Sequence, residues 1–213
     1  MATIRKWSNV QMSMQSALAA ADTITGITKA SPAVVTSAAH GMSNGDFVFL
    51  SVLGMHQLND RVFRIANVAA NTFELEGIDA TSYDNFTSGT ANEVTFGTTL
   101  SSVSDINVSG GDFQMIDVTT IHDNVKKEVP GSASPVSISM TANWDPSDAG
   151  LVALKSASDA RAQRAIRFTF SDSKKWVFNG YIGCTLSPTG QAQNKVSTPL
   201  TITAYGKPRA YTS

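Results

Sequence analysis

The stretch VSISMTANWDPSDAG, residues 136–150, decides how the chain folds. Apolar and polar residues alternate without a break over residues 136–144, which predicts a β-strand with one buried face. The polar positions of this strand are Ser137, Ser139, Thr141 and Asn143. None of these side chains carries a charge, so the outer face of the strand is wettable but neutral.

A helix is predicted to follow this strand at once. Asp145 can cap it, Pro146 suits the first helical position because its missing N–H would have no partner there, and Asp148 adds negative charge to the first turn. The helix is expected to end within residues 158–161. Its apolar stripe consists of Leu151, Leu154 and Ala157.

Alternation with a period of two marks strands elsewhere in the chain, so the predicted fold class is mainly β with one flanking helix. The segments around Phe168 and Trp176 are joined by SDSKK, residues 171–175, which predicts a hairpin. The residues expected on buried strand faces are Val10, Met12, Met14, Ile166, Phe168, Phe170, Trp176, Phe178, Ile182, Cys184, Leu186, Leu200, Ile202 and Ala204.

Residues 26–91 differ from the rest because short strand-like runs are broken by Asn-Gly, Leu-Gly and Ser-Gly punctuation. Strand patterns continue on both sides of this segment. We therefore predict a small all-β module, 26–91, inserted into a host domain made of residues 1–25 and 92–213.

The composition favours neutral contacts over charged ones. Of the 213 residues 42% are hydrophobic and 15% are charged, and the formal net charge is −1. A typical globular protein has roughly 25% charged residues. This balance gives no sign of a protein that grips nucleic acid or an anionic membrane. No run approaches the length of a membrane span, and Gln11, Ser13 and Gln15 interrupt any signal-peptide core, so neither a span nor a signal peptide is expected.

Motifs for catalysis, metals or cofactors do not emerge from the sequence. There is no GxSxG, GxxxxGK or strand-linked GxGxxG motif. Cys184 falls on the apolar positions of its strand, and His40, His56 and His122 lack metal-ligand spacing. We therefore predict no catalytic residue, no metal and no cofactor.

A loop is predicted between two strands at VKKEVPGSASP, residues 125–135. The neighbouring Lys-Lys-Glu and Val-Pro-Gly suggest a protruding loop whose charges form salt bridges to a neighbour, with plain solvent exposure as the alternative. The residues assigned to this contact are Lys126, Lys127, Glu128, Val129, Pro130 and Gly131.

Several segments together resemble the major tail tube proteins of long-tailed, lambda-like bacteriophages. They are, in chain order, IDVTTI at 116–121, EVPG at 128–131, NWDPSDAG at 143–150, RFTFSDSKKWVFNGYI at 167–182 and PLTITAYGKP at 199–208. The resemblance covers nearly all of the host domain. The lambda-like pattern has an additional immunoglobulin-like domain at the C-terminus, which is not expected here because the sequence stops at Ser213.

The resemblance implies a β-sandwich or barrel whose copies form hexameric rings that stack head to tail into the tube of a virion. The implied partners are further copies of the chain, the tape-measure, tail terminator and baseplate or tip proteins, and double-stranded DNA that passes without specific binding. Synthesis in the host cytoplasm, no membrane contact and no catalysed reaction follow from the same resemblance.

A tube wall would explain the neutral strand. Each Lys or Arg facing DNA adds a sequence-independent attraction, and many subunits repeat it along a tube. Side chains that face the lumen or a neighbour should therefore be wettable but uncharged, as Ser137, Ser139, Thr141 and Asn143 are.

The segment HGMSNGDFVFLSVLGMHQLNDRVFRIANVAANTFEL, residues 40–75, resembles a small β module of phage structural proteins. That module is named after the first catalytic cysteine half-domain of ubiquitin-activating enzymes. Residues 26–91 contain no cysteine, so the resemblance implies a β-rich decoration and no activating chemistry.

A second hypothesis keeps the β-rich fold but assigns a different function. The chain would be a carbohydrate-binding or adhesin β-sandwich, in which exposed aromatic rings stack on sugars. The stacking candidates are Tyr83, Phe86 and Trp176.

Overall fold

The computed structural model describes residues 9–212. Residues 1–8 lie outside the described residues. The expectation that the chain has no signal peptide falls partly on them. Within residues 9–212 the ordered elements are strands, one α-helix and one 3-10 turn, so the mainly β prediction is confirmed. In chain order they are β1 (Gln11–Leu18), β2 (Asp22–Ile27), β3 (Ala33–Ser37), β4 (Phe47–Leu53), the 3-10 turn η1 (His56–Leu58), β5 (Arg61–Ala69), β6 (Thr72–Leu75), β7 (Ser88–Leu100), β8 (Val103–Ser109), β9 (Phe113–Asp117), β10 (Glu128–Ala133), β11 (Ser137–Asn143), α1 (Ala149–Asp159), β12 (Arg164–Thr169), β13 (Lys175–Cys184) and β14 (Ser197–Tyr211).

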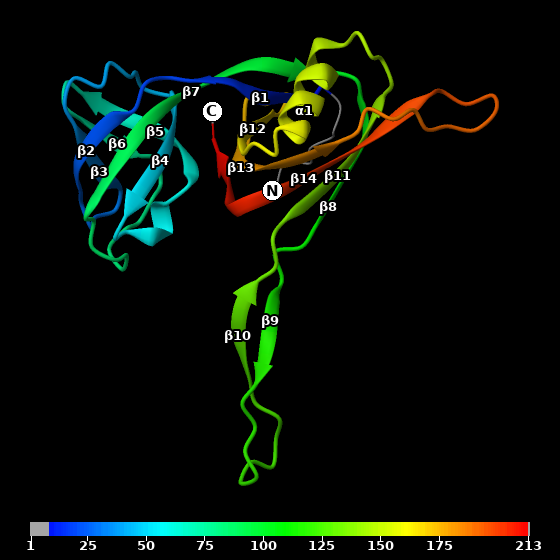
Figure 1. The fold of residues 1–213 in the computed structure, drawn as a ribbon. Coiled ribbons are helices and arrows are strands. Elements are labelled where there is room, and N and C mark those ends of the chain that lie inside the picture. Colours follow the sequence, from blue (N-terminus) through cyan, green and yellow to red (C-terminus); the bar gives the residue numbers. More distant parts are fainter. Residues whose placement is uncertain (1–8, 213) are drawn as a thin grey trace.

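One body of the molecule is a curved antiparallel sheet with α1 packed on its inner side (Figure 1). Its strand order is β7-β1-β12-β13-β14-β11-β8. The predicted hairpin is present as β12 and β13, with Phe168 opposite Trp176. The core between sheet and helix consists of Met12, Met14, Leu100, Ile138, Met140, Ala142, Leu151, Leu154, Ala157, Ile166, Phe168, Phe178, Ile182, Cys184, Leu200, Ile202 and Ala204. We call this body the tube domain.

The strand predicted over residues 136–144 is β11, which lies between β14 and β8. Ile138, Met140 and Ala142 are buried, as the alternation predicts. The neutral side chains between them therefore point away from the core, because successive residues of a strand face opposite sides of the sheet.

The helix start differs from the prediction. Asp148, and not Asp145, is the N-cap of α1, and its Oδ1 accepts a hydrogen bond from the Leu151 backbone N at 2.9 Å. Asp145 instead forms a turn of its own, because its Oδ1 accepts from the backbone N and the hydroxyl of Ser147 at 2.8 and 2.6 Å. Pro146 consequently lies in this turn and not at the first helical position.

Substituting each aspartate in turn should show which of the two caps the helix. We expect Asp148→Ala to lower the free energy of unfolding by about 1 kcal/mol, because the Leu151 N–H loses its acceptor. Asp145→Ala should cost less, since that side chain binds only an exposed turn outside the helix. Urea denaturation of both variants measures the difference. A larger loss for Asp145→Ala would contradict the observed cap.

The other body is a closed six-stranded barrel with the order β2-β3-β6-β5-β4-β7, in which β7 also pairs with β2. The first half of the long strand β7 belongs to this barrel and the second half pairs with β1 of the tube domain. The barrel strands extend a few residues beyond 26–91, from Asp22 of β2 to Glu93 of β7. Its core consists of Ile24, Ile27, Ala33, Val35, Met42, Val48, Leu50, Val52, Met55, Leu58, Phe63, Ile65, Phe73, Leu75, Ile78, Ala80 and Ala91.

A third apolar cluster packs between the barrel and the outer side of the tube-domain sheet. It consists of Phe47, Val62, Val94, Ala165, Val177 and Tyr211. The Tyr211 hydroxyl accepts a hydrogen bond from the Arg64 backbone N at 3.0 Å, and the Arg64 guanidinium binds Glu76 and the Thr212 carbonyl. The burial of Tyr211 raises the pKa of its phenol. Apolar packing and hydrogen bonds thus join the two bodies.

Candidate functional site

A two-stranded arm leaves the tube domain between β8 and β11 and extends far beyond both bodies (Figure 1). It consists of β9, β10 and the tip that joins them, residues 112–134, and forms a sheet of its own. The chain turns into the arm at Gly110, whose φ is +84°. A Cβ at Gly110 would lie 2.3 Å from the Pro135 carbonyl oxygen, so only glycine fits this turn.

The predicted loop residues lie on this arm, but the local structure differs from the prediction. Lys126 and Lys127 belong to the tip, whereas Glu128–Ala133 form strand β10. These residues form a strand because they pair with the antiparallel strand β9, with Val129 opposite Ile116 and Pro130 opposite Met115. The proline is tolerated because the strand is at an edge. The lysines form ion pairs within the arm, Lys126 with Glu128 and Lys127 with Asp123.

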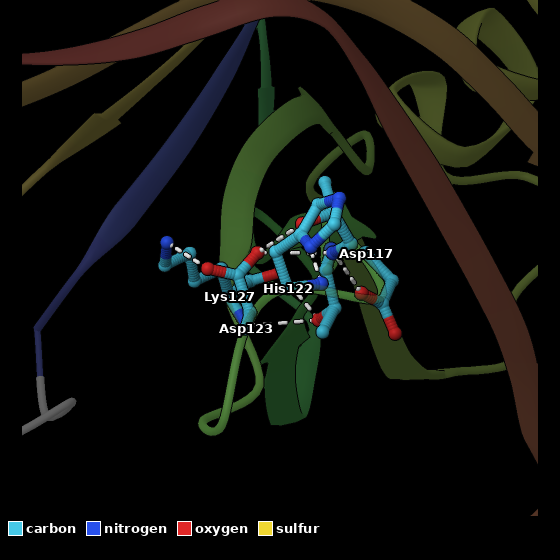
Figure 2. Close-up of polar contacts among 6 residues, drawn as sticks. Asp117, His122, Asp123 and Lys127 are labelled. Atoms are coloured by element: carbon cyan, nitrogen blue, oxygen red, sulfur yellow. Dashed lines mark hydrogen bonds and ion pairs between the residues drawn. The ribbon is translucent and has the colours of Figure 1, made fainter.

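Polar groups of the arm form hydrogen bonds and an ion pair with one another at the tip (Figure 2). Asp123 Oδ2 accepts hydrogen bonds from the Thr120 backbone N at 3.0 Å and the Thr120 hydroxyl at 2.9 Å. Asp117 Oδ1 accepts from the Thr119 backbone N at 2.8 Å. The hydrogen bond from Lys127 lowers the pKa of Asp123 most, and the hydrogen bonds from Thr120 lower it further. Hydrogen bonds from Thr119 lower the pKa of Asp117.

These pKa shifts predict how the tip responds to acid. A carboxyl whose folded pKa lies below its unfolded value stabilises the ordered tip above the unfolded pKa of about 3.9. That stabilisation is lost as the pH falls through the lower, folded value. Lys127→Met should raise the pKa of Asp123 and leave that of Asp117 unchanged, because Lys127 pairs only with the former. NMR titration of the two carboxyl carbons measures this. Parallel shifts of both groups would contradict the assignment.

The arm carries many apolar side chains, and within residues 9–212 most of them are about half exposed or more. Ile121 at the tip is 96% exposed and Val125 is 74% exposed. Sequence reasoning predicted a strand before the loop at 125–135 but missed this exposure, and the strand β9 ends at Asp117, so Ile121 lies in the tip. The signal is present in the sequence, because apolar residues occupy both alternating sets of positions over Phe113–Val118, a pattern typical of strands buried on both faces.

The predicted neutral residues lie on one broad sheet face, which we call the neutral face. Ser137 is opposite Thr203 and Ser109, Ser139 is opposite Thr201 and Asn107, and Thr141 is opposite Pro199 and Asp105. Asn143 and Ser197 continue the face. Tyr181 and Gly183 extend it onto β13. Among the residues just named Asp105 is the one with a charged side chain, and none is Lys or Arg. Further along β13 and β14 the same side of the sheet carries Arg209 opposite Val177, where the barrel packs.

The remaining candidates do not converge on a site. Cys184 is buried in the tube-domain core, as predicted. Tyr83 and Phe86 pack against the barrel core and Trp176 against the tube-domain core, so the three proposed stacking residues are not brought together. Among the described residues no group of three His, Cys, Asp or Glu side chains is arranged to hold a metal. No helix within residues 9–212 is long and apolar enough to cross a membrane.

Comparison with known proteins gives one family. The family described as "Phage tail tube protein, TTP" matches residues 53–213. Among solved structures the chain resembles the tail of an empty GTA particle of C6 symmetry, with 13% identity and a TM-score of 0.41, over 56% of this chain and 87% of the other. No curated protein matches the chain.

Proposed function

This chain belongs to the phage tail tube protein family and is a structural subunit of a phage tail tube, and we propose that it forms hexameric rings stacked head to tail through the arm. The uncovered apolar arm is the observation that carries this proposal. An apolar strand pair that protrudes into solvent favours association with another protein surface. A contact between an arm and a different surface of the next copy is heterologous, which produces an open filament.

The edges of the sheet suggest how one ring closes. Among the described residues β8 pairs with β11 alone, so its other edge is free to bind a strand. An unpaired edge invites pairing with another chain, and closure into a barrel satisfies all edges. We therefore place the edge strand β8 at the contact between subunits of one ring.

The neutral face would line the lumen. Its side chains are hydroxyls, amides and one carboxylate, which hydrate well and offer no cation to phosphate. Before ejection the lumen would hold the tape-measure protein, and afterwards DNA would pass without specific binding. Tail terminator and baseplate or tip proteins would bound the tube, which would be assembled in the host cytoplasm. The barrel would decorate the tube.

Electron microscopy of the purified chain tests the assembly. Concentrated protein, alone or with its tail initiator complex, should give hollow tubes built from six-fold rings. Protein that stays monomeric under both conditions would contradict the proposal.

A cation on the neutral face should slow DNA. Ser139→Lys places an ammonium on this face in every subunit, and the repeated attraction should slow DNA ejection from assembled phage, with relief at higher salt. Thr25→Lys, at an exposed position of barrel strand β2, adds the same charge elsewhere and serves as the matched control. Ejection rates are measured after both variants have been shown to form tails. A rate for Ser139→Lys equal to that of the control would place the face outside the lumen.

A further inference from the structure

The junction between the barrel and strand β14 contains a cleft of about 500 Å³, which we call the seam cleft. A volume of this size is typical of sites that hold a small molecule. Its lining includes Gln57, Arg61 and Tyr83 from the barrel and Tyr205, Gly206 and Lys207 from β14. Both bodies of the molecule are therefore needed to form the cleft.

Arg61 spans the seam cleft from the barrel to β14. Its Nη1 donates to the Gln57 carbonyl at 2.8 Å, and its Nη2 donates to the Lys207 carbonyl at 3.2 Å. Gly206 has a φ of +80°, and a Cβ there would lie 3.5 Å from Arg61 Cγ, so the backbone of β14 runs along the stem of the arginine. A guanidinium has five N–H groups. Two of them hold Arg61 in place, and the others remain to donate to a ligand.

The cations of the seam cleft lack acidic partners among residues 9–212. Neither Arg61 nor Lys207 forms an ion pair there, whereas Arg64 on the same strand binds Glu76. Burial is the main cause that lowers the pKa of Arg61, and the nearby Arg209 cation acts in the same direction. A partly buried cation without a counter-charge is unfavourable, and a bound anion would offset that cost.

The carboxylates next to the lining residues in the chain are already bound to amides. Asp84 Oδ2 accepts from the side-chain amide of Gln57 at 2.9 Å. Asp60 Oδ2 accepts from the side-chain amide of Asn59 at 2.9 Å. The seam cleft thus offers cationic N–H donors, and the tyrosines of its lining add hydroxyl donors. Such a set of donors suits an oxyanion.

We propose that the seam cleft is a binding site for a small divalent oxyanion, a phosphate group, held by the guanidinium of Arg61 and the ammonium of Lys207. The planar fork of an arginine binds two oxygens of one anion, and a lysine adds a point charge. Two cations favour a doubly charged phosphate over a monoanion. The site goes beyond the proposed function. It lies outside the neutral face, because β11 pairs with β14 only as far as Thr203.

Titration with inorganic phosphate tests the site. Isotope-labelled chain, kept too dilute to assemble, is titrated at constant ionic strength against chloride, and NMR follows the Arg61 Nε–H and the backbone N–H groups of Gly206 and Lys207. We expect saturable shifts in the wild type, binding about tenfold weaker in Lys207→Met, and no saturable shift in Arg61→Met. Lys29→Met removes the same group from an exposed position of the barrel outside the cleft and should bind as the wild type does.

Wild-type shifts that do not saturate would overturn the site, and so would equal affinities of Lys207→Met and Lys29→Met. If Arg61→Met fails to fold, as its melting temperature shows, the two lysine variants decide alone. Glycerol phosphate and glycerol separate the possible sources of the phosphate. Tighter binding of glycerol phosphate than of inorganic phosphate, with no binding of glycerol, assigns the site to a phosphate ester, and equal binding of the two phosphates assigns it to the free anion. A DNA duplex that shifts the same resonances at equal phosphate concentration would overturn a site for a small divalent anion.

Discussion

A variant in which the two-residue turn Asn-Gly replaces residues 113–133 is expected to fold normally and to form no tubes. The ends of the deletion are already adjacent, since the Ser134 backbone N donates to the Asp112 carbonyl at 2.9 Å, and Asn-Gly suits a two-residue hairpin turn. Among residues 9–212, no arm residue belongs to any of the three buried clusters. The variant should therefore keep its melting temperature and lose only the contact between rings.

Calorimetry and electron microscopy on the same samples check both halves of this expectation. Single rings without tubes would place the arm at the contact between rings, as proposed. Tubes of normal length from the armless chain would refute a stacking role for the arm. A large fall in melting temperature would show instead that the arm supports the monomer.

Phe168→Ala is expected to destabilise the chain by about 3–5 kcal/mol, the usual cost of removing a fully buried phenylalanine. The ring of Phe168 is fully buried, and its centroid lies 5.6 Å from that of Trp176 and 6.3 Å from that of Phe178. Truncation leaves a cavity in the core of the tube domain, beside these aromatic rings. A domain of this size has only about 5–15 kcal/mol of stability, so much of it would be lost.

Phe113→Ala is the matched control, because the same side chain is removed from the exposed arm. Its free energy of unfolding should stay within about 0.5 kcal/mol of wild type, while its tube assembly weakens. Urea denaturation measures the stabilities and electron microscopy the assembly. Equal destabilisation by the two substitutions would contradict the contrast between core and arm.

The alternation of apolar and polar residues was enough to predict the strands β1, β11, β12, β13 and β14 of the tube domain and which side of each faces the core. Met140 and Ile202 are buried, as this pattern requires. The pattern works because strand side chains alternate between two faces, so burial of one face fixes the identity of every second residue. The neutral outer face of β11 could be recognised for the same reason.

The exact helix cap was decided by local geometry that the sequence leaves open. Asp145 and Asp148 are both good capping residues and lie three positions apart. The hydrogen bonds of Asp145 to Ser147 close a turn first, which leaves Asp148 for α1. The same composition allows either start, and only the path of the chain selects one.

Contacts between segments that lie far apart in the sequence decided the features that local patterns did not predict. Ser13 lies on the predicted polar face of β1, yet it is buried, as is Gln15 two positions further on, whose Oε1 accepts from the Ala165 N–H at 3.0 Å. The sequence determined the strands, the helix and the neutral face because local periodicity encodes them. The tertiary structure alone decided that the barrel packs on the back of the sheet and that the arm stands free, because burial of a face depends on what the rest of the chain places against it.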